Sequence, residues 1–225
     1  FGLDSTILRH VAAPPASASA GSQCRNAGND ESKPFVIGFA GSVTAKPQLE
    51  LLQEALDRVD WQINGREIRL DLYGLRFVLH SRTARNVRYC GYRSVDDTVA
   101  ALSETADLLF MPQPFDKQSA SFTELSFPTK LSTYFAAGRP VLLISPPKSS
   151  LGEFFDKHPF GVWCSEMNAD RLLESLRTIA TDPHLQQAAT ETIKRLLQDS
   201  FNADHFRKQL HRFLAIDKSP QSVIT

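Results

Sequence analysis

The segment Ser126–Val141 combines residue types that can build an anion-binding site. Pro128 suits the first turn of a helix, and Gly138 suits the left-handed position that ends one. Backbone N–H groups at a helix start have no partner inside the helix and lie at the positive end of its dipole, so they often bind phosphate. The groups concerned are those of Thr129, Lys130 and Leu131. The alternative is an ordinary connection between a helix and a strand, because most helix starts bind nothing.

A second candidate is the loop Gly38–Pro47, which follows an apolar run. Gly41 permits a ligand to approach the backbone closely, and Ser42 comes next. Lys46 stands just before a predicted helix, where its ammonium group could reach a diphosphate. The loop is neither a Walker A motif nor a dinucleotide-binding fingerprint. A solvated lysine is therefore the alternative interpretation.

A third candidate is the loop that ends the segment Val87–Ser94. The ring of Tyr92 could stack on a nucleotide base. A half-buried loop tyrosine without a ligand is an equally good interpretation of this residue alone. The six histidines show no paired spacing, and no Ser-His-Asp or Cys-His arrangement is indicated, so neither a metal site nor a catalytic triad is expected.

Strand-like and helix-like patterns alternate from Lys33 onward and must position these loops. The alternation predicts an α/β fold with a single Rossmann-like, doubly wound, mostly parallel sheet, helices on both faces and C-terminal helices. The expected strands are 34–39, 68–73, 87–89, 107–111, 141–145 and 161–164; the expected helices are 49–59, 94–102, 128–138, 152–156, 169–180, 183–197 and 204–214. Ligands of such sheets bind beyond the carboxyl ends of the strands, where the loops after Phe39 and Phe127 are expected to project.

Composition divides the chain into three parts. Residues 12–32 are rich in Ala, Pro, Ser, Gly and Asn, which is typical of a linker. We therefore expect a linker or extended N-terminal segment over 1–33, a Rossmann-like domain over 34–216 and a tail over 217–225. The chain does not begin with Met, and a fragment of a longer protein is expected.

The 225 residues hold 25 basic and 25 acidic side chains, which gives no case for nucleic acid as a partner. No apolar run approaches the roughly 20 residues of a membrane span. Three widely spaced cysteines favour free thiols in a reducing compartment, so a cytoplasmic location is expected.

The segment from Phe127 to Val141 resembles the motif of retaining, nucleotide-sugar-dependent glycosyltransferases of the GT-B fold (glycosyl transferases group 1), which often read Pro-x-Lys-Leu-x-Glu-Tyr-Leu-Ala-Ala-Gly-x-Pro-Val. The resemblance extends from about Phe35 to about Leu214. It implies that this chain is the C-terminal, donor-binding domain of such an enzyme. The donor-binding residues implied are Gly41, Ser42, Lys46, Tyr92, Phe127, Thr129, Lys130, Leu131 and Thr133.

Three positions depart from the family motif. Many members carry arginine where this chain has Ser42. The motif also has a glutamate just before the Phe-Pro pair, where this chain has Leu125 with Glu124 next to it, and a glutamate in the helix that accepts the ribose hydroxyls, where this chain has Thr133. Phe127 and the amides after Pro128 match the donor-phosphate side of the pocket, and Tyr92 lies in the loop that cradles the base.

The resemblance implies transfer of a sugar from a nucleotide diphosphate donor to a carbohydrate or lipid-linked acceptor, with cell-envelope or exopolysaccharide synthesis as the expected pathway. No cofactor is required. The partner is an N-terminal Rossmann-like domain outside the chain that holds most catalytic groups, so the fragment alone is expected to be inactive, and the full protein could associate peripherally with a membrane. One alternative is a non-catalytic binding or scaffold module with a pocket eroded at Ser42 and Thr133. A sugar-nucleotide epimerase is another, although its acidic pair is not evident.

Overall fold

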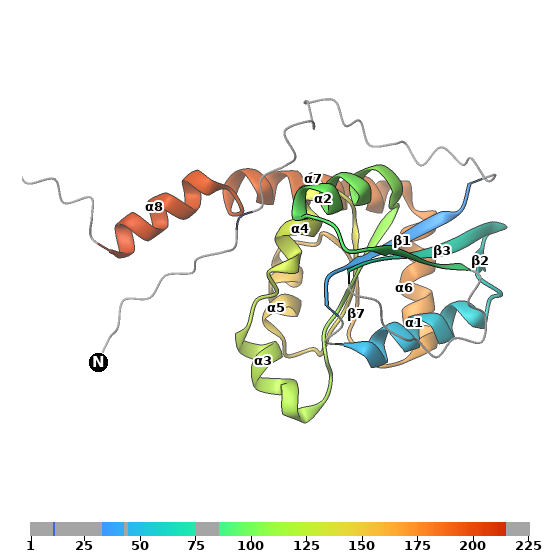
Figure 1. Cartoon of the computed structure of the whole chain (residues 1–225). Coiled ribbons are helices and arrows are strands. Elements are labelled where there is room, and N and C mark those ends of the chain that lie inside the picture. Colours follow the sequence, from blue (N-terminus) through green and yellow to red (C-terminus); the bar gives the residue numbers. More distant parts are fainter. Residues whose placement is uncertain (1–10, 12–32, 43–44, 75–85, 215–225) are drawn as a thin grey trace, which may run out of the picture.

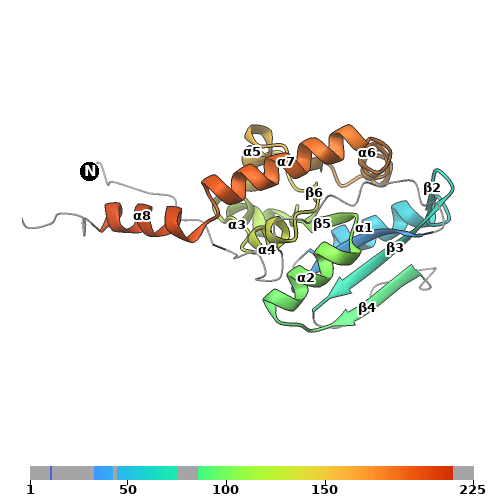
Figure 2. The ribbon, with the colours of Figure 1, turned by 90° about the horizontal axis from the view of Figure 1, so that it is seen from above.

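The apolar runs form one mostly parallel sheet in the computed structural model, which describes residues 11, 33–42, 45–74 and 86–214. Its parallel strands are β1 (Phe35–Ala40), β3 (Arg66–Tyr73), β4 (Val87–Gly91), β5 (Leu108–Pro112), β6 (Val141–Ile144) and β7 (Gly161–Cys164). They pair in the order β4-β3-β1-β5-β6-β7. Seen from above, β4 lies at one edge of the sheet and β6 lies toward the opposite side (Figure 2). Counted along the chain this is the order 3-2-1-4-5-6 of a doubly wound Rossmann sheet, which confirms the predicted fold class.

One short strand was not predicted. β2 (Gln62–Ile63) pairs antiparallel with the start of β3 through a two-residue turn at Asn64-Gly65. Both turn residues have positive φ angles, 51° and 77°, as a type I′ hairpin turn requires. The Asn-Gly pair was therefore a readable hairpin signal.

The strands alternate their side chains between two apolar layers. Leu108, Leu142 and Ile144 face one layer, where they meet α1 (Lys46–Asp57) and α6 (Ala169–Thr181). Leu109 and Leu143 face the other layer with α2 (Val95–Thr105), α4 (Lys130–Ala137), α5 (Ser150–Lys157) and α7 (Pro183–Asp199). Because each layer buries a continuous apolar surface, the sheet edge is a rigid support for the loops.

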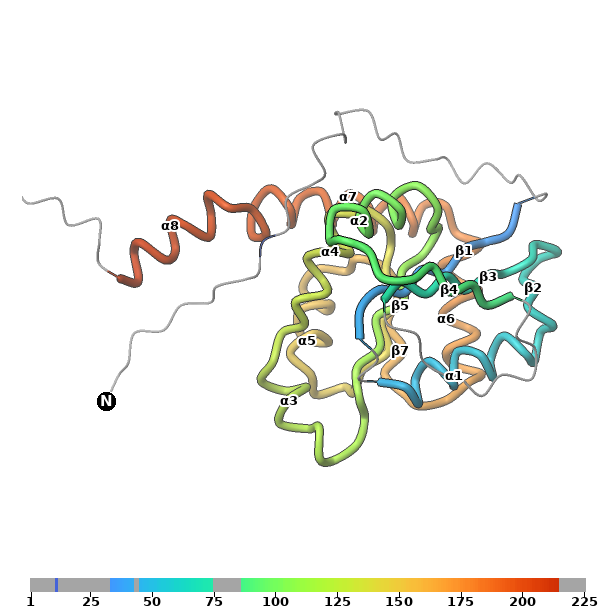
Figure 3. The backbone as a smooth tube through the Cα atoms, in the orientation of Figure 1, coloured from blue at the N-terminus to red at the C-terminus, as the bar shows by residue number. Residues whose placement is uncertain are grey.

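The chain crosses between the two layers more than once. The last crossing, from α6 in the first layer to α7 in the second, can be followed along the tube in Figure 3. The 3₁₀ turn Lys117–Ser119 and α3 (Ala120–Leu125), which were not predicted, link β5 to the segment before α4. The final helix α8 (Ala203–Phe213) has no buried residue and extends away from the sheet (Figure 1).

Local signals set the helix ends near the candidate site. Ser94 caps α2, and its side chain accepts a hydrogen bond from the backbone N–H of Asp97, as the capping pattern predicts. Gly138 ends α4 in the left-handed conformation, with φ 68° and ψ 25°. Most of the predicted linker 1–33 and the predicted tail 217–225 lie outside the described residues.

Candidate functional site

A cavity of about 590 Å³ opens at the carboxyl edge of the sheet. Its walls come from the ends of β1 and β3, the loop after β4, and the first turns of α2 and α4. The structure thus brings together two loops that the sequence predicted to share this edge. The lining residues are Val11, Ala40, Gly41, Ser42, Tyr73, Gly74, Tyr92, Arg93, Val95, Asp96, Thr98, Thr129, Lys130, Ser132 and Thr133.

Backbone contacts between strand ends fix the sheet side of the cavity. The N–H of Gly41 donates to the carbonyl of Tyr73, and the N–H of Gly74 donates to the carbonyl of Gly91, each at 2.9 Å. A Cβ atom on Gly74 would lie 2.7 Å from the carbonyl oxygen of Gly41. Gly41 and Gly74 also have φ angles of 107° and 132°, which other residues rarely adopt. Glycine is therefore required where these loops meet.

The ammonium group of Lys130 reaches across the cavity from α4 to the end of β1. Its Nζ lies 4.2 Å from the centre of the Phe39 ring and donates to the carbonyl of Ser42 at 3.4 Å. Burial lowers the pKa of this amine from 10.5 to about 8. A positive charge thus stands in a partly desolvated position beside the predicted phosphate site.

The start of α4 differs in detail from the sequence expectation. The helix begins at Lys130, with Thr129 as its cap and Pro128 one residue before that cap. The N–H of Leu131 donates to the carbonyl of Pro128 at 3.1 Å, so this amide is already engaged in a tight first turn. The backbone N–H groups of Thr129 and Lys130 are the other two predicted donors at this helix start, and both residues line the cavity.

Two polar residues follow on the first turn of α4. Ser132 is buried and its hydroxyl donates to the carbonyl of Thr129 at 2.7 Å. Thr133 is partly exposed and lines the cavity. The side chain that was predicted to face a ribose therefore borders the space in which a ligand would lie.

The other end of the cavity is more open. The ring of Tyr92 is 82% exposed and forms part of the lining. The guanidinium group of Arg93 lies 5.3 Å from the centre of the Tyr73 ring. A flat, exposed ring at this end could stack on a nucleotide base.

Three of the predicted residues do not line this cavity. The ammonium group of Lys46 lies 3.4 Å from a carboxylate oxygen of Glu50 in the next turn of α1. The ring of Phe127 packs at right angles to the ring of Phe154, with centroids 5.2 Å apart. The side chain of Leu131 is fully buried. Both apolar residues thus support the helix that carries Thr129 and Lys130.

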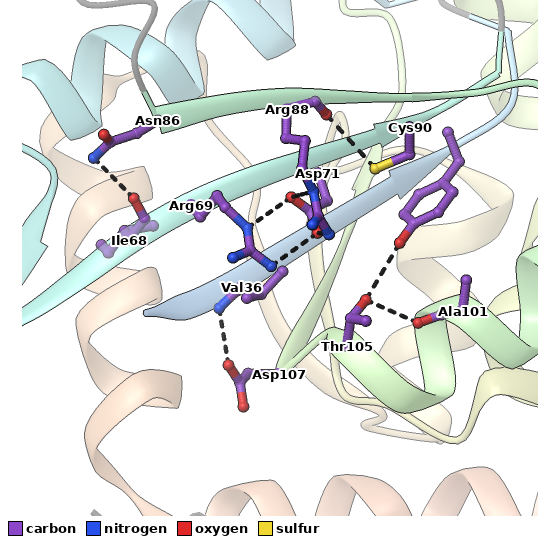
Figure 4. A network of polar contacts seen from close by, with 11 residues as sticks. Val36, Ile68, Arg69, Asp71, Asn86, Arg88, Cys90, Ala101, Thr105 and Asp107 are labelled. Carbon is purple, nitrogen blue, oxygen red and sulfur yellow. Dashed lines mark hydrogen bonds and ion pairs between the residues drawn. The ribbon is translucent and has the colours of Figure 1, made fainter. Parts of the chain in front are cut away.

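The strands beside the cavity hold an ion network that the sequence did not reveal (Figure 4). Asp71, on β3, is completely buried, and both its carboxylate oxygens accept hydrogen bonds from Arg69 and from Arg88 of β4 at 2.5–3.2 Å. A second cavity of about 720 Å³ adjoins the network and includes Arg88, Tyr89, Cys90 and Glu104. It shares Tyr73 and Arg93 with the first cavity.

Over the described part of the chain, no group of three or more His, Cys, Asp and Glu side chains could hold a metal ion. Within the same residues, no helix is both long enough and apolar enough to cross a membrane. The lining of the cavity supplies backbone amides, hydroxyl groups, a lysine, an arginine and the carboxylate of Asp96.

The sheet order, the cavity at the carboxyl edge and the glycines at the strand ends define a Rossmann-like domain. Solved structures with a similar fold include several glycosyltransferases. HepE from Anabaena, solved with UDP and glucose, matches 83% of this chain and 49% of its own at 15% identity, with a TM-score of 0.59. WaaG, a glycosyltransferase involved in lipopolysaccharide biosynthesis, matches 95% of this chain and 56% of its own at 17% identity, with a TM-score of 0.60.

A trehalose 6-phosphate synthase from Burkholderia multivorans also matches, over 82% of this chain and 43% of its own at 10% identity, with a TM-score of 0.57. The chain thus spans about half the length of these structures and has the Rossmann-like fold of a GT-B glycosyltransferase domain. No model of a known protein family matches the sequence. No curated protein matches it either.

Proposed function

We propose that this chain is the donor-binding domain of a glycosyltransferase and that its cavity binds a nucleotide diphosphate sugar. The observation that carries this proposal is the meeting of Gly41, Lys130 and the start of α4 at one sheet edge. Amides at a helix start and an ammonium group together suit a diphosphate. The structures of HepE with UDP and with UDP-glucose support the choice of ligand class, because that protein shares the fold.

The ligand lies along the cavity in a defined direction in this proposal. The diphosphate takes the end formed by Ser42, Thr129 and Lys130, and the base takes the open end at Tyr92. The ribose then falls near Thr133, between the two ends. A cavity of about 590 Å³ is within the 300–1,000 Å³ typical of small-molecule sites.

The chemistry proposed is retaining transfer of a hexose, with the domain stabilising the departing nucleoside diphosphate. As the bond from the sugar to the diphosphate breaks, negative charge grows on the phosphate oxygens. Donors already aimed at that charge lower the barrier, because they need no rearrangement during the reaction. The groups that provide such donors here are the amides at the start of α4 and the ammonium group of Lys130, so no further cofactor is invoked.

We propose that the acceptor, a carbohydrate or lipid-linked glycan of polysaccharide synthesis, is held by a second Rossmann-like domain outside these 225 residues. The matched glycosyltransferase structures are about twice as long as the part they share with this chain. The isolated chain is accordingly expected to bind the donor without transferring its sugar, as part of a cytoplasmic protein that associates peripherally with a membrane.

A binding module without catalysis is the second candidate. The serine at position 42 and the threonine at position 133 favour it, because each replaces a charged residue of the family motif with a neutral one. The two candidates share the ligand and differ in turnover, so activity of the full-length protein separates them.

A thermal-shift screen with UDP, GDP, ADP, CDP and dTDP tests the proposed ligand class. A ligand present at 100 times its dissociation constant adds about 2.7 kcal/mol to the free energy of unfolding. At least one diphosphate should raise the melting temperature, and the matching nucleoside should raise it less. No shift with any diphosphate at millimolar concentration would overturn the proposal.

A further inference from the structure

We propose that guanine is the base that this cavity selects, through the side chains of Arg93 and Asp96. The inference rests on the proposed function, which puts the base of a nucleoside diphosphate at the open end beside Tyr92, and it names that base. Its starting point is a pair of opposite charges in the lining, on the segment from the end of β4 to the first turn of α2. A carboxylate repels a diphosphate, so its contact is with another part of the ligand.

Arg93 and Asp96 are both exposed and both keep hydrogen-bonding capacity for a ligand. The guanidinium group of Arg93 lies 5.3 Å from the centre of the Tyr73 ring. Over the described part of the chain, no ion pair or hydrogen bond includes the side chain of either residue. The N–H donors of the one and the carboxylate oxygens of the other therefore remain for a ligand.

The segment that carries these side chains is fixed at both ends. At its start, the carbonyl of Gly91 accepts a hydrogen bond from the N–H of Gly74 at 2.9 Å. At its end, the carbonyl of Ser94 accepts a hydrogen bond from the hydroxyl group of Thr98 at 2.7 Å. A short segment between two anchored ends loses little freedom when it binds a ligand, which favours discrimination between ligands of similar shape.

The two acids in the first turn of α2 differ in their contacts. The carboxylate of Asp97 accepts a hydrogen bond from the hydroxyl group of Ser94 at 2.7 Å and borders the second cavity. Asp96 borders the first cavity and has no such partner. An acid at a helix start also stabilises the helix through its dipole, which is the alternative role of Asp96. That role alone would treat every base alike, whereas a contact with the base would not.

A carboxylate and a guanidinium group together distinguish guanine from the other bases. Guanine has adjacent donors, N1–H and the 2-amino group, which the two oxygens of a carboxylate accept together. It also has adjacent acceptors, O6 and N7, which a guanidinium group binds in parallel. Uracil and thymine place a carbonyl oxygen on each side of their N3–H donor, and these oxygens repel a carboxylate. Adenine and cytosine offer an amino group with no second donor beside it.

Calorimetry with diphosphates that differ only in the base tests the selection. The probes are GDP, ADP, CDP, UDP and IDP, which is GDP without the 2-amino group. GDP should bind about 10-fold more tightly than IDP or UDP, because each of these loses one or both hydrogen bonds of a bidentate pair. Any other probe that binds as tightly as GDP would overturn this inference and leave the proposed function standing. If no diphosphate binds, both are overturned.

Three variants assign the contacts. Asp96→Asn replaces one acceptor oxygen with an amino donor, and a carboxamide pairs with the N3–H and O4 of uracil. The ratio of the UDP to the GDP dissociation constant should therefore fall about 10-fold from its wild-type value. Arg93→Gln should weaken the binding of GDP more than that of UDP. Glu104→Gln, at an exposed acid of α2 that borders the second cavity, is the matched control and should leave the ratio unchanged.

A helix-start role for Asp96 gives a different result. Asp96→Asn would then weaken GDP and UDP by the same factor, and this outcome would overturn the inference. Melting curves establish whether each variant is folded. If Asp96→Asn does not fold, the comparison of GDP with IDP on the wild-type chain decides, because it removes the same hydrogen bond from the side of the ligand.

Discussion

The hydroxyl group of Tyr134 connects the helix of the candidate site to the strand that leads into it. It accepts a hydrogen bond from the backbone N–H of Ala40 at 3.0 Å and donates one to the carbonyl of Phe110 at 2.9 Å. Tyr134 is fully buried, so both bonds lie in the interior. Ala40 directly precedes Gly41, and Tyr134 lies one turn beyond Lys130. This one side chain therefore fixes the distance between the two halves of the cavity.

Tyr134→Phe should lower the free energy of unfolding by about 1–3 kcal/mol, because a buried backbone N–H and a buried carbonyl each lose a partner. Urea unfolding of the two proteins measures the difference. Tyr92→Phe, at an exposed position, is the control and should change stability by less than about 0.5 kcal/mol. Equal unfolding midpoints for Tyr134→Phe and wild type would show that the hydroxyl does not bear on the packing of α4.

Asp71→Asn should destabilise the pairing of β3 with β4. Its carboxylate is fully buried and accepts hydrogen bonds from two arginines, so removal of its charge leaves Arg69 and Arg88 without compensation. Because both guanidinium groups keep contact with solvent, the expected cost is about 1–3 kcal/mol. A double-mutant cycle with Arg88→Met measures the coupling between the two side chains. Additive effects in that cycle would contradict the pairing.

The pH dependence of diphosphate binding should follow the amine of Lys130. Its free-state pKa is lowered to about 8, so the cation is present at pH 7 and largely lost at pH 9. The second phosphate ionisation, near pH 6, is largely complete by pH 7 and adds negative charge as the pH rises, so it does not account for a fall in affinity. The other titratable or charged side chains of the described lining are Tyr73, Tyr92, Arg93 and Asp96, and burial raises the pKa of Tyr73 above its usual 10. Affinity measured by calorimetry should therefore fall between pH 7 and pH 9.

Lys130→Arg should flatten this profile, because a guanidinium group stays charged throughout.

The lowered pKa of Lys130 also affects the stability of the fold, and here the free energy of unfolding should rise with pH while the affinity for the diphosphate falls. Between pH 8 and pH 10.5 the unfolded chain holds this proton and the folded chain does not, so the free energy of unfolding rises with pH. At pH 7 Lys130→Met should accordingly stabilise the domain, by about 1–2 kcal/mol after allowance for solvent near the amine. A wild-type binding profile that stays level to pH 9 would contradict the role of the lysine.

Thr133→Glu should strengthen donor binding by about 1–3 kcal/mol, because two charged oxygens replace one hydroxyl opposite the ribose. Thr133 lines the cavity and is partly exposed, so a longer side chain has room. Thr133→Gln is the control of similar size without charge. If calorimetry shows that Thr133→Glu binds the donor no more tightly than wild type, or if the variant is unfolded, then the ribose does not lie beside residue 133.

The sequence predicted the sheet because its strands are apolar runs bounded by Pro and Gly, whose local preferences agree with the fold. Gly138 and the Ser94 cap were predictable for the same reason. The roles of Lys46 and Lys130 were harder to separate. Both lysines stand at helix starts, and only the approach of α4 to the end of β1 places one ammonium group in the cavity and leaves the other beside Glu50. The burial of Asp71 likewise depends on strand neighbours that no local pattern specifies.

The central claim, that a nucleoside diphosphate binds at this edge of the sheet, is tested most directly by mapping backbone amide resonances during a titration with UDP. We predict saturable shifts that cluster at Gly41, Ser42, Tyr92, Thr129 and Lys130, with smaller changes when uridine replaces UDP. Shifts confined to the second cavity, around Arg88 and Glu104, or shifts that do not saturate, would contradict the account.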